Sequence, residues 1–186
     1  MSANLYVALL HDGMVDKTGK SVTTSLTLND MQDLARSSRT FGVEKLFVVH
    51  STPAMRKLAK RLQTHWLSGF GSTYNADRKE AMSFLVIASD LEEIIMEVER
   101  DTGKLPKLVA TSARKGPDRL SYASFRKELE TTETPHILMF GTGWGMGPEL
   151  MARAQVVLEP IDGPGDYNHL SVRSACAISL DRLKGK

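Results

Sequence analysis

The chain has 186 residues, of which 41% are hydrophobic and 25% are charged, and its formal net charge is +2. These proportions are those of ordinary globular proteins and exclude a disordered or fibrous chain. The small net charge excludes a uniformly basic nucleic-acid coat protein. The length suits one domain with a full core, so we expect residues 1–186 to form a single domain.

Three absences narrow the class further. The first ten residues carry no basic cluster, and no apolar run approaches membrane-spanning length, which predicts a cytoplasmic protein without a membrane contact. Cys176 is the only cysteine, and its apolar neighbours predict a buried thiol rather than a nucleophile. No grouping of His, Cys and carboxylates has the spacing of a metal site, so we expect no metal.

Short apolar runs predict buried strands. In chain order they cover residues 5–10, 46–49, 84–88, 108–110, 137–140 and 156–158. Apolar residues at helical spacing, preceded by capping residues or a first-turn proline, predict helices. In chain order they cover residues 28–41, 53–62, 90–102, 121–129, 148–153 and 171–183. Because strands and helices alternate, we expect an α/β fold with a mostly parallel sheet and helices on both faces.

Two polar segments separate these elements. Residues 11–25 are expected to form a long loop, and residues 68–80 a surface connection.

The helix that begins at Pro53 has an unusual charge pattern. Its inward face is expected to carry Met55, Leu58, Ala59 and Leu62. Its other positions carry Arg56, Lys57, Lys60 and Arg61. A solvated basic face explains this pattern, and a stripe that contacts the RNA backbone is the second interpretation.

The strand at residues 137–140 ends in a glycine-rich segment. Glycines alternate at Gly141, Gly143, Gly145 and Gly147. Such glycines permit positive φ and let the backbone approach a ligand closely, although they could also form a simple turn. The segment matches neither the dinucleotide fingerprint nor the phosphate loop of nucleotide hydrolases.

Three strand ends in the C-terminal half carry loops rich in Gly, Ser, Thr and Asp. They cover residues 111–114, 141–147 and 160–169. Ligands of open parallel sheets bind at the carboxyl ends of the strands, where such loops converge. The sequence therefore predicts a pocket rich in backbone donors.

Four segments together resemble a known class of enzymes. They are RSSRTFG at 36–42, TSARKG at 111–116, FGTGWGMG at 140–147 and NHLSVRSACAISLDRL at 168–183. In this order they resemble the SPOUT class of RNA methyltransferases. Residues 25–50 and the last two motifs are most similar to a small bacterial family described as S-adenosylmethionine-dependent RNA methyltransferases.

The resemblance implies a C-terminal trefoil knot that binds S-adenosylmethionine and releases S-adenosylhomocysteine. It also implies tRNA or rRNA as the substrate and a homodimer, with which the apolar last helix beside the motif-bearing first helix is consistent. The implied cofactor-binding residues are Thr111, Ser112, Ala113, Phe140, Gly141, Thr142, Gly143, Trp144, Gly145, Pro160, Ile161, Asn168, Leu170 and Ser171.

The candidate catalytic residues are Arg36, Asp166 and His169. By resemblance Arg36 is the arginine of the first motif, and we expect it to hold an RNA phosphate or orient the nucleophile. Asp162 and Asp166 are possible bases if the methylated atom is a ring nitrogen, although turn aspartates commonly bond their own backbone. His169 is a further proton acceptor.

Two departures from the class leave the methylated atom open. The second motif has no acidic residue, and His169 stands where the ribose-methylating branch has asparagine. Transfer to a ribose hydroxyl and transfer to a base nitrogen are therefore both retained. A non-catalytic α/β module that binds nucleotides or RNA is the alternative to an enzyme.

Overall fold

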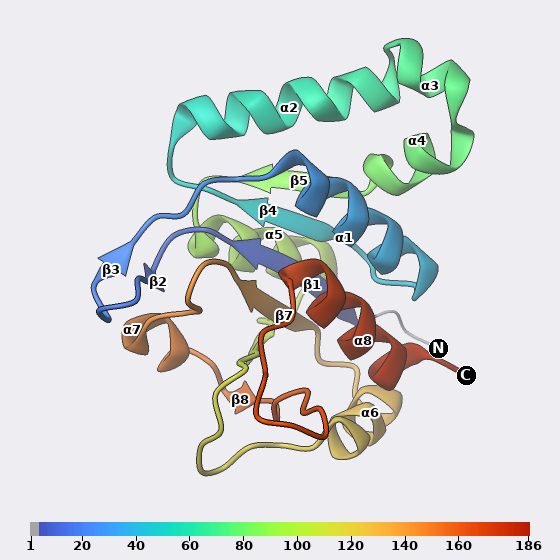
Figure 1. Cartoon of the computed structure of the whole chain (residues 1–186). Coiled ribbons are helices and arrows are strands. Elements are labelled where there is room, and N and C mark those ends of the chain that lie inside the picture. The colour runs from blue at the N-terminus through green and yellow to red at the C-terminus, as the bar shows by residue number, and fades with distance from the viewer. Residues whose placement is uncertain (1–3) are drawn as a thin grey trace.

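Six parallel strands form the central sheet, in the order β5-β4-β1-β7-β6-β8 (Figure 1). The computed structural model describes residues 4–186. The strands are β1 (Leu5–Leu10), β4 (Leu46–Val49), β5 (Leu85–Ala88), β6 (Lys107–Ala110), β7 (His136–Gly141) and β8 (Val156–Val157). Each predicted strand is present to within one residue at either end, and the predicted parallel sheet is confirmed.

Helices cover both faces of the sheet, as expected (Figure 1). They are α1 (Leu28–Thr40), α2 (Pro53–Leu67), α3 (Phe70–Tyr74), α4 (Ala76–Ser83), α5 (Leu91–Thr102), α6 (Tyr122–Thr131), α7 (Pro148–Met151) and α8 (Val172–Lys184). Strand β1 shows the division, because side chains alternate across a strand. Leu5, Val7 and Leu9 pack into the core beneath α1, α6 and α8, and the intervening residues pack into the core beneath α5 and α7.

The predicted surface connection at residues 68–80 is wrong, because the segment contains α3 and the first part of α4. The Asn75 side chain caps α4 by accepting from the Arg78 N–H at 2.9 Å. Ala81 and Met82 give α4 a buried edge. The helix is short and has few apolar residues, so its periodicity is weak in the sequence.

Helix α2 is longer than predicted, and its inward face differs. It continues to Leu67, and Trp66 is buried whereas Leu58 is 38% exposed. Met55, Ala59, Leu62 and Trp66 form the stripe that faces the rest of the protein. Helix α2 packs mainly against α3 and α4 and less against α1 and β5, so its inward stripe is narrow.

The segment 11–25 is not entirely loop. Two short antiparallel strands, β2 (Met14–Val15) and β3 (Ser21–Val22), form a hairpin within it. Met14 and Val15 are buried, so the hairpin is anchored to the domain.

Cys176 is buried in the core on the inner side of α8, as predicted. Burial raises the pKa of its thiol to about 12. The thiol therefore stays protonated at neutral pH and is unsuited to act as a nucleophile.

Within the described part of the chain, residues 4–186, no helix has both the length and the apolar composition needed to cross a bilayer.

Candidate functional site

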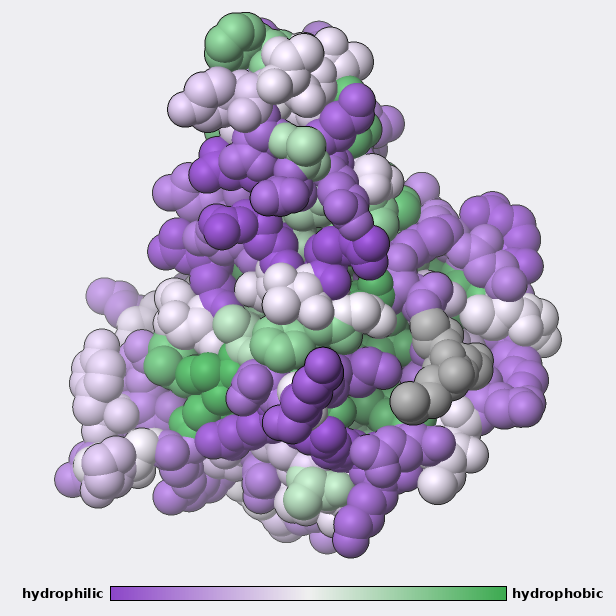
Figure 2. All heavy atoms as spheres, turned by 90° about the vertical axis from the view of Figure 1, so that its right-hand side faces the viewer, coloured by the Kyte–Doolittle hydropathy of each residue, from purple (hydrophilic) through white to green (hydrophobic). Residues whose placement is uncertain are grey.

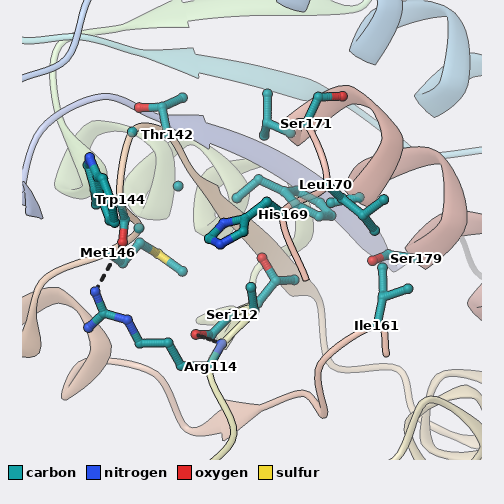
Figure 3. Close-up of a pocket in the computed structure, with 18 of the residues that line it drawn as sticks. Ser112, Arg114, Thr142, Trp144, Met146, Ile161, His169, Leu170, Ser171 and Ser179 are labelled. Carbon is teal, nitrogen blue, oxygen red and sulfur yellow. Dashed lines mark hydrogen bonds between the residues drawn. The ribbon is translucent and has the colours of Figure 1, made fainter. Parts of the chain in front are cut away.

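A cavity of about 740 Å³ lies at the carboxyl ends of β6 and β7 (Figure 3). Three loops line it: residues 111–114 after β6, residues 141–146 at the end of β7, and the loop before α8 through Ile161 and residues 168–171. This volume is within the range of cavities that bind small molecules and cofactors. The three loops predicted to converge do so.

The conformation of the loop after β7 requires glycine at more than one position. Gly143 and Gly145 have φ of +61° and +98°, in the region that favours glycine. Gly141 is closely packed, because a Cβ there would lie 2.8 Å from Met146 Cγ and 3.0 Å from Met14 Sδ. The glycines thus fix a tight loop whose backbone borders the cavity.

The hairpin segment supports this loop from behind. The Gly147 N–H donates to the Gly13 carbonyl at 2.8 Å, and the Val15 N–H donates to the Gly145 carbonyl at 2.9 Å. The Thr142 hydroxyl donates to the Leu10 carbonyl at 3.1 Å and is also hydrogen-bonded to the Thr24 hydroxyl. The long segment after β1 therefore has a role in holding the glycine loop.

The loop after β6 is bonded to both other loops. Asn168 Nδ2 donates to the Ala113 carbonyl at 3.0 Å, and the Lys115 ammonium lies 3.2 Å from an Asp162 carboxylate oxygen. Arg114 donates to the Trp144 carbonyl at 3.3 Å, the bond drawn as a dashed line in Figure 3. The cavity wall is therefore a connected set of loops.

Most of the residues expected to bind the cofactor line the cavity. They are Thr111, Ser112, Ala113, Phe140, Gly141, Thr142, Gly143, Trp144, Gly145, Ile161, Asn168, Leu170 and Ser171. Pro160 does not, because it directly follows Glu159, whose N–H pairs with the Leu120 carbonyl at the sheet edge. Trp144 is 58% exposed, so it lies at the cavity rim and is not a core residue.

Sequence analysis missed several residues of the wall. Thr24, Ser25, Thr27, Asp30, Tyr122, Val172, Ala175 and Ser179 also line the cavity, together with Arg114 and Met146 of the predicted loops. The Tyr122 hydroxyl bonds Ser179 Oγ at 2.9 Å in a buried contact between α6 and α8. Only tertiary packing joins these two helices. In the sequence Asp30 stands three residues after Thr27 at the start of a helix, a spacing typical of helix caps, and its N–H donates to Thr27 Oγ1 at 3.3 Å.

Asp30 is the one acidic residue among the described residues that line this cavity. Its side chain is 15% exposed, and its Oδ1 lies 3.3 Å from Arg173 Nε of α8. Asp30 therefore joins α1 to α8 by an ion pair at the cavity edge.

The three proposed catalytic residues do not lie together at one site within a single copy of the chain. His169 lines the cavity and packs edge-on against Tyr167, with ring centroids 5.3 Å apart. Asp166 is exposed and does not line the cavity. Arg36 lies in a second cleft of about 570 Å³ between α1 and α4, which it shares with Arg39 and Arg78.

Within residues 4–186, no three His, Cys, Asp or Glu side chains are grouped so that they could hold a metal ion.

A buried histidine pair lies at the ends of β1 and β4. The rings of His11 and His50 are stacked with centroids 5.1 Å apart, and His11 Nδ1 lies 2.9 Å from the Val49 carbonyl oxygen. Burial lowers the pKa of His11 below its usual value. The His11 carbonyl also accepts from the Thr24 N–H at 2.9 Å, which connects the pair to the cavity wall.

We expect the free energy of unfolding to decrease as the pH falls below about 6.5, the pKa of a histidine in an unfolded chain. Below this pH His11 binds a proton in the unfolded chain more readily than in the folded protein, because its pKa is lower in the folded protein. The contribution of neutral His11 to stability is therefore present above this pH and is lost as the pH falls below it. The slope for one such histidine is at most about 1.4 kcal/mol per pH unit. Urea unfolding between about pH 7.5 and 5.5 should show a smaller loss in His11→Asn than in wild type. The exposed His65 provides the control as His65→Asn. Parallel curves for all three proteins would contradict the assignment.

Comparison with known proteins identifies the family. The model of the SAM-dependent RNA methyltransferase family matches residues 4–185. An uncharacterized protein of Aquifex aeolicus is 40% identical over 183 residues, covering 98% of this chain and 89% of its own length.

A tRNA (guanine-N(1)-)-methyltransferase of Oleidesulfovibrio alaskensis is 41% identical over 182 residues. The match covers 98% of this chain but only 42% of that protein, so the larger part of the relative has no counterpart here.

Among solved structures, TrmJ from Z. mobilis ZM4 matches with a TM-score of 0.62 at 14% identity, covering 100% of this chain and 70% of that one. The likeness shows that the two chains share a fold. Together with the match along almost the whole sequence, it identifies this chain as a member of the family of SAM-dependent RNA methyltransferases, which are enzymes.

Proposed function

We propose that this enzyme transfers a methyl group from S-adenosylmethionine, bound in the cavity of the three loops, to a ribose hydroxyl or base nitrogen of tRNA or rRNA. The observation that carries the proposal is the cavity itself, at which three of the four segments that resemble the class's motifs converge and Gly143 and Gly145 adopt positive φ. Cytoplasmic localisation belongs to the same proposal, since RNA is the substrate.

The residues of the cavity suit this cofactor. Gly143 and Gly145 leave backbone groups accessible to a polar ligand. Phe140, Ile161 and Leu170 supply apolar surface for a flat ring, and Trp144 at the rim can cover it. When bound, S-adenosylmethionine supplies an electrophilic methyl group on a sulfonium. The chain must position the nucleophile and remove its proton.

We propose His169 as the proton acceptor. It lines the cavity on the loop before α8, and among the described residues it makes no ion pair. Imidazole is the commonest general base in enzymes. Asp30 also lines the cavity, but it is paired with Arg173, which favours a positioning role for that carboxylate. Asp166 has no comparable support, because it lies outside the cavity wall.

We further propose that Arg36 acts on the RNA bound at the cavity of a second copy of the chain. Arg36 is exposed and has no carboxylate partner among residues 4–186. The start of α1 lines the cavity through Asp30, but Arg36 lies about 9 Å further along the helix axis and borders a different cleft. A symmetric dimer through the α1 and α8 side would let each subunit supply an arginine to the other.

The trefoil knot is part of this proposal. Its support is that residues 111–116 bond to Asp162 and Asn168, so the chain leaving β8 returns against the loop between β6 and α6 before α8 begins. Knots are rare, and tension on both ends of a knotted chain tightens the knot and does not release it. Pulling on both termini should therefore give an unfolded length shorter than the roughly 630 Å of an extended 186-residue chain.

The test of the activity is transfer of tritiated methyl from S-adenosylmethionine to RNA from cells that lack the gene. We expect RNA to be labelled, and mass spectrometry of the digested RNA then identifies the methylated nucleoside. Absence of labelling together with absence of cofactor binding would overturn the proposal. Sedimentation at micromolar concentration tests the dimer, and a protein that stays monomeric would exclude the shared site.

A further inference from the structure

Positive charge is concentrated on one helix. The whole chain has 24 basic and 22 acidic residues. Helix α2 carries four basic residues and no acidic one, so the remainder of the chain has a net charge of −2. The small net charge of the protein therefore hides a local basic surface.

Three of these four side chains are available to a ligand. Arg56 is committed, because it donates to the His50 carbonyl at 2.7 Å and also to the Ser51 carbonyl. Lys57, Lys60 and Arg61 are exposed, and none of them forms an ion pair with a residue in the range 4–186. Basic side chains without carboxylate partners attract anions along a helix face.

The basic face continues to an exposed aromatic pair. Lys57, Arg61 and His65 follow one another at intervals of four residues, which places them on one stripe of α2. The stripe ends at His65, whose ring packs against Gly71 of α3. A Cβ added to Gly71 would lie 3.0 Å from His65 Nε2. The basic stripe therefore leads directly onto α3.

Helix α3 presents Phe70 and Tyr74 to solvent. Each is 77% exposed, and their rings are stacked with centroids 6.1 Å apart and planes inclined by 21°. Helices α2, α3 and α4 form a projection whose free end faces the viewer in Figure 2, where it is largely hydrophilic with a hydrophobic residue exposed at its tip. Two large solvent-exposed aromatic rings beside basic side chains are typical of surfaces on which the bases of single-stranded nucleic acids stack.

Helix α3 is closely packed on the residues beneath it. A Cβ at Gly71 would lie 2.6 Å from the Trp66 ring, so α3 rests on Trp66 through a glycine. The Arg78 guanidinium covers Trp66 at 4.8 Å from the ring centroid. Gln63 donates to the Met82 and Leu85 carbonyls at 3.1 and 2.6 Å and holds α4 in place. The aromatic pair is therefore presented by an ordered support.

We propose that this surface, formed by Lys57, Lys60, Arg61, Phe70 and Tyr74, binds a single-stranded segment of the RNA substrate. The cations of α2 contact the phosphates, and the rings of α3 stack with unpaired bases. No residue of α2, α3 or α4 lines the cofactor cavity, so this is a separate site. The inference rests on the RNA substrate proposed above. The inference adds that part of the RNA binds on α2 and α3, away from the cavity in which the methyl group is transferred.

The test measures binding of a 20-nucleotide oligouridine by fluorescence anisotropy, without S-adenosylmethionine, over a range of salt concentrations. Each phosphate contact in single-stranded binding contributes about 0.7 to the slope of log affinity against log salt. Lys57→Gln/Lys60→Gln should therefore lower this slope by about 1.4. Lys127→Gln/Lys186→Gln removes the same charge from exposed positions elsewhere and should leave the slope unchanged.

The aromatic residues are tested separately. Phe70→Ala and Tyr74→Ala should each weaken binding of oligouridine by about five- to hundredfold, with an unchanged salt slope. Phe70→Trp should retain binding. A 20-base-pair duplex RNA, whose bases are not available for stacking, should be insensitive to all three changes.

Equal salt slopes for the two lysine variants, or unchanged oligouridine binding in both alanine variants, would overturn the proposal. The same lysine and alanine variants are tested on phosphatidylserine vesicles. If they lose vesicle binding but still bind oligouridine as the wild type does, the surface is a membrane contact and the proposal is overturned. The thermal shift by S-adenosylmethionine is measured on the same proteins and should be unaffected. Failure of that shift in wild type as well would count against the cofactor assignment and not against this RNA site.

Discussion

Replacing Gly143 by valine should abolish binding of S-adenosylmethionine and leave the protein folded. Gly143 has φ of +61°, and a Cβ there would lie 2.9 Å from Thr24 Cγ2. A branched side chain must therefore displace Thr24 or the loop, and both line the cavity. Gly143 is exposed, so the clash falls on the binding wall and not on the core.

Thermal unfolding measures this effect. Ligand at a hundred times its dissociation constant adds about 2.7 kcal/mol to the stability of a protein that binds it. For a chain of this size that is an increase of roughly 5–11 °C in the unfolding midpoint. We expect this increase in wild type and none in Gly143→Val, whose circular dichroism should remain that of the folded protein.

Substitutions at two other glycines distinguish a steric clash from backbone strain as the cause of lost binding. Gly163 has neither positive φ nor an atom within 4 Å of its Cβ position, so Gly163→Ala should keep the full shift. Gly145 has φ of +98° but open space around it, so Gly145→Ala isolates the effect of backbone strain. A full shift in Gly143→Val would mean that the cofactor does not contact this loop.

Local patterns in the sequence were sufficient to predict the strands of the sheet but not to predict helix α4 or some of the residues that line the cavity. Strand β1 is buried along its whole length and β7 at every residue but Gly141, so each contains a continuous apolar run bounded by polar or glycine residues. Helix α4 escaped detection because only Ala81 and Met82 are buried along it. A helix that packs against another helix at the edge of the protein needs few apolar residues.

The site shows the same division. The glycine loop is recognisable because its chemistry is local, and the loops after parallel strands converge by a general rule. Tyr122 and Ser179 could not be paired from the sequence, since their contact depends on how α6 crosses α8. The position of Arg36 was equally inaccessible, because a motif gives a residue type and a helix but not the cleft that the side chain borders.

Replacing Arg36 by alanine should lower single-turnover methylation by about a hundredfold, equivalent to roughly 3 kcal/mol of transition-state stabilisation. Cofactor affinity should barely change, because Arg36 lies outside the cofactor cavity. Arg36→Lys should restore little activity, since an ammonium cannot reproduce the planar guanidinium that binds a phosphate by two hydrogen bonds. Arg39 borders the same cleft but pairs with Glu80, so Arg39→Ala is the matched control and should have a smaller effect.

Mixing two inactive variants decides whether Arg36 acts within its own chain or across a dimer. Arg36→Ala retains an intact cofactor cavity, and Gly143→Val retains an intact Arg36. If the arginine acts across the dimer, each mixed dimer has one complete site, so subunit exchange at equal amounts should restore about a quarter of the wild-type activity. If the arginine acts within its own chain, no site in the mixture is complete and activity stays at the level of the single variants. Full activity of Arg36→Ala alone would remove this arginine from the mechanism and leave His169, then Asp30, as the residues to test at the cavity.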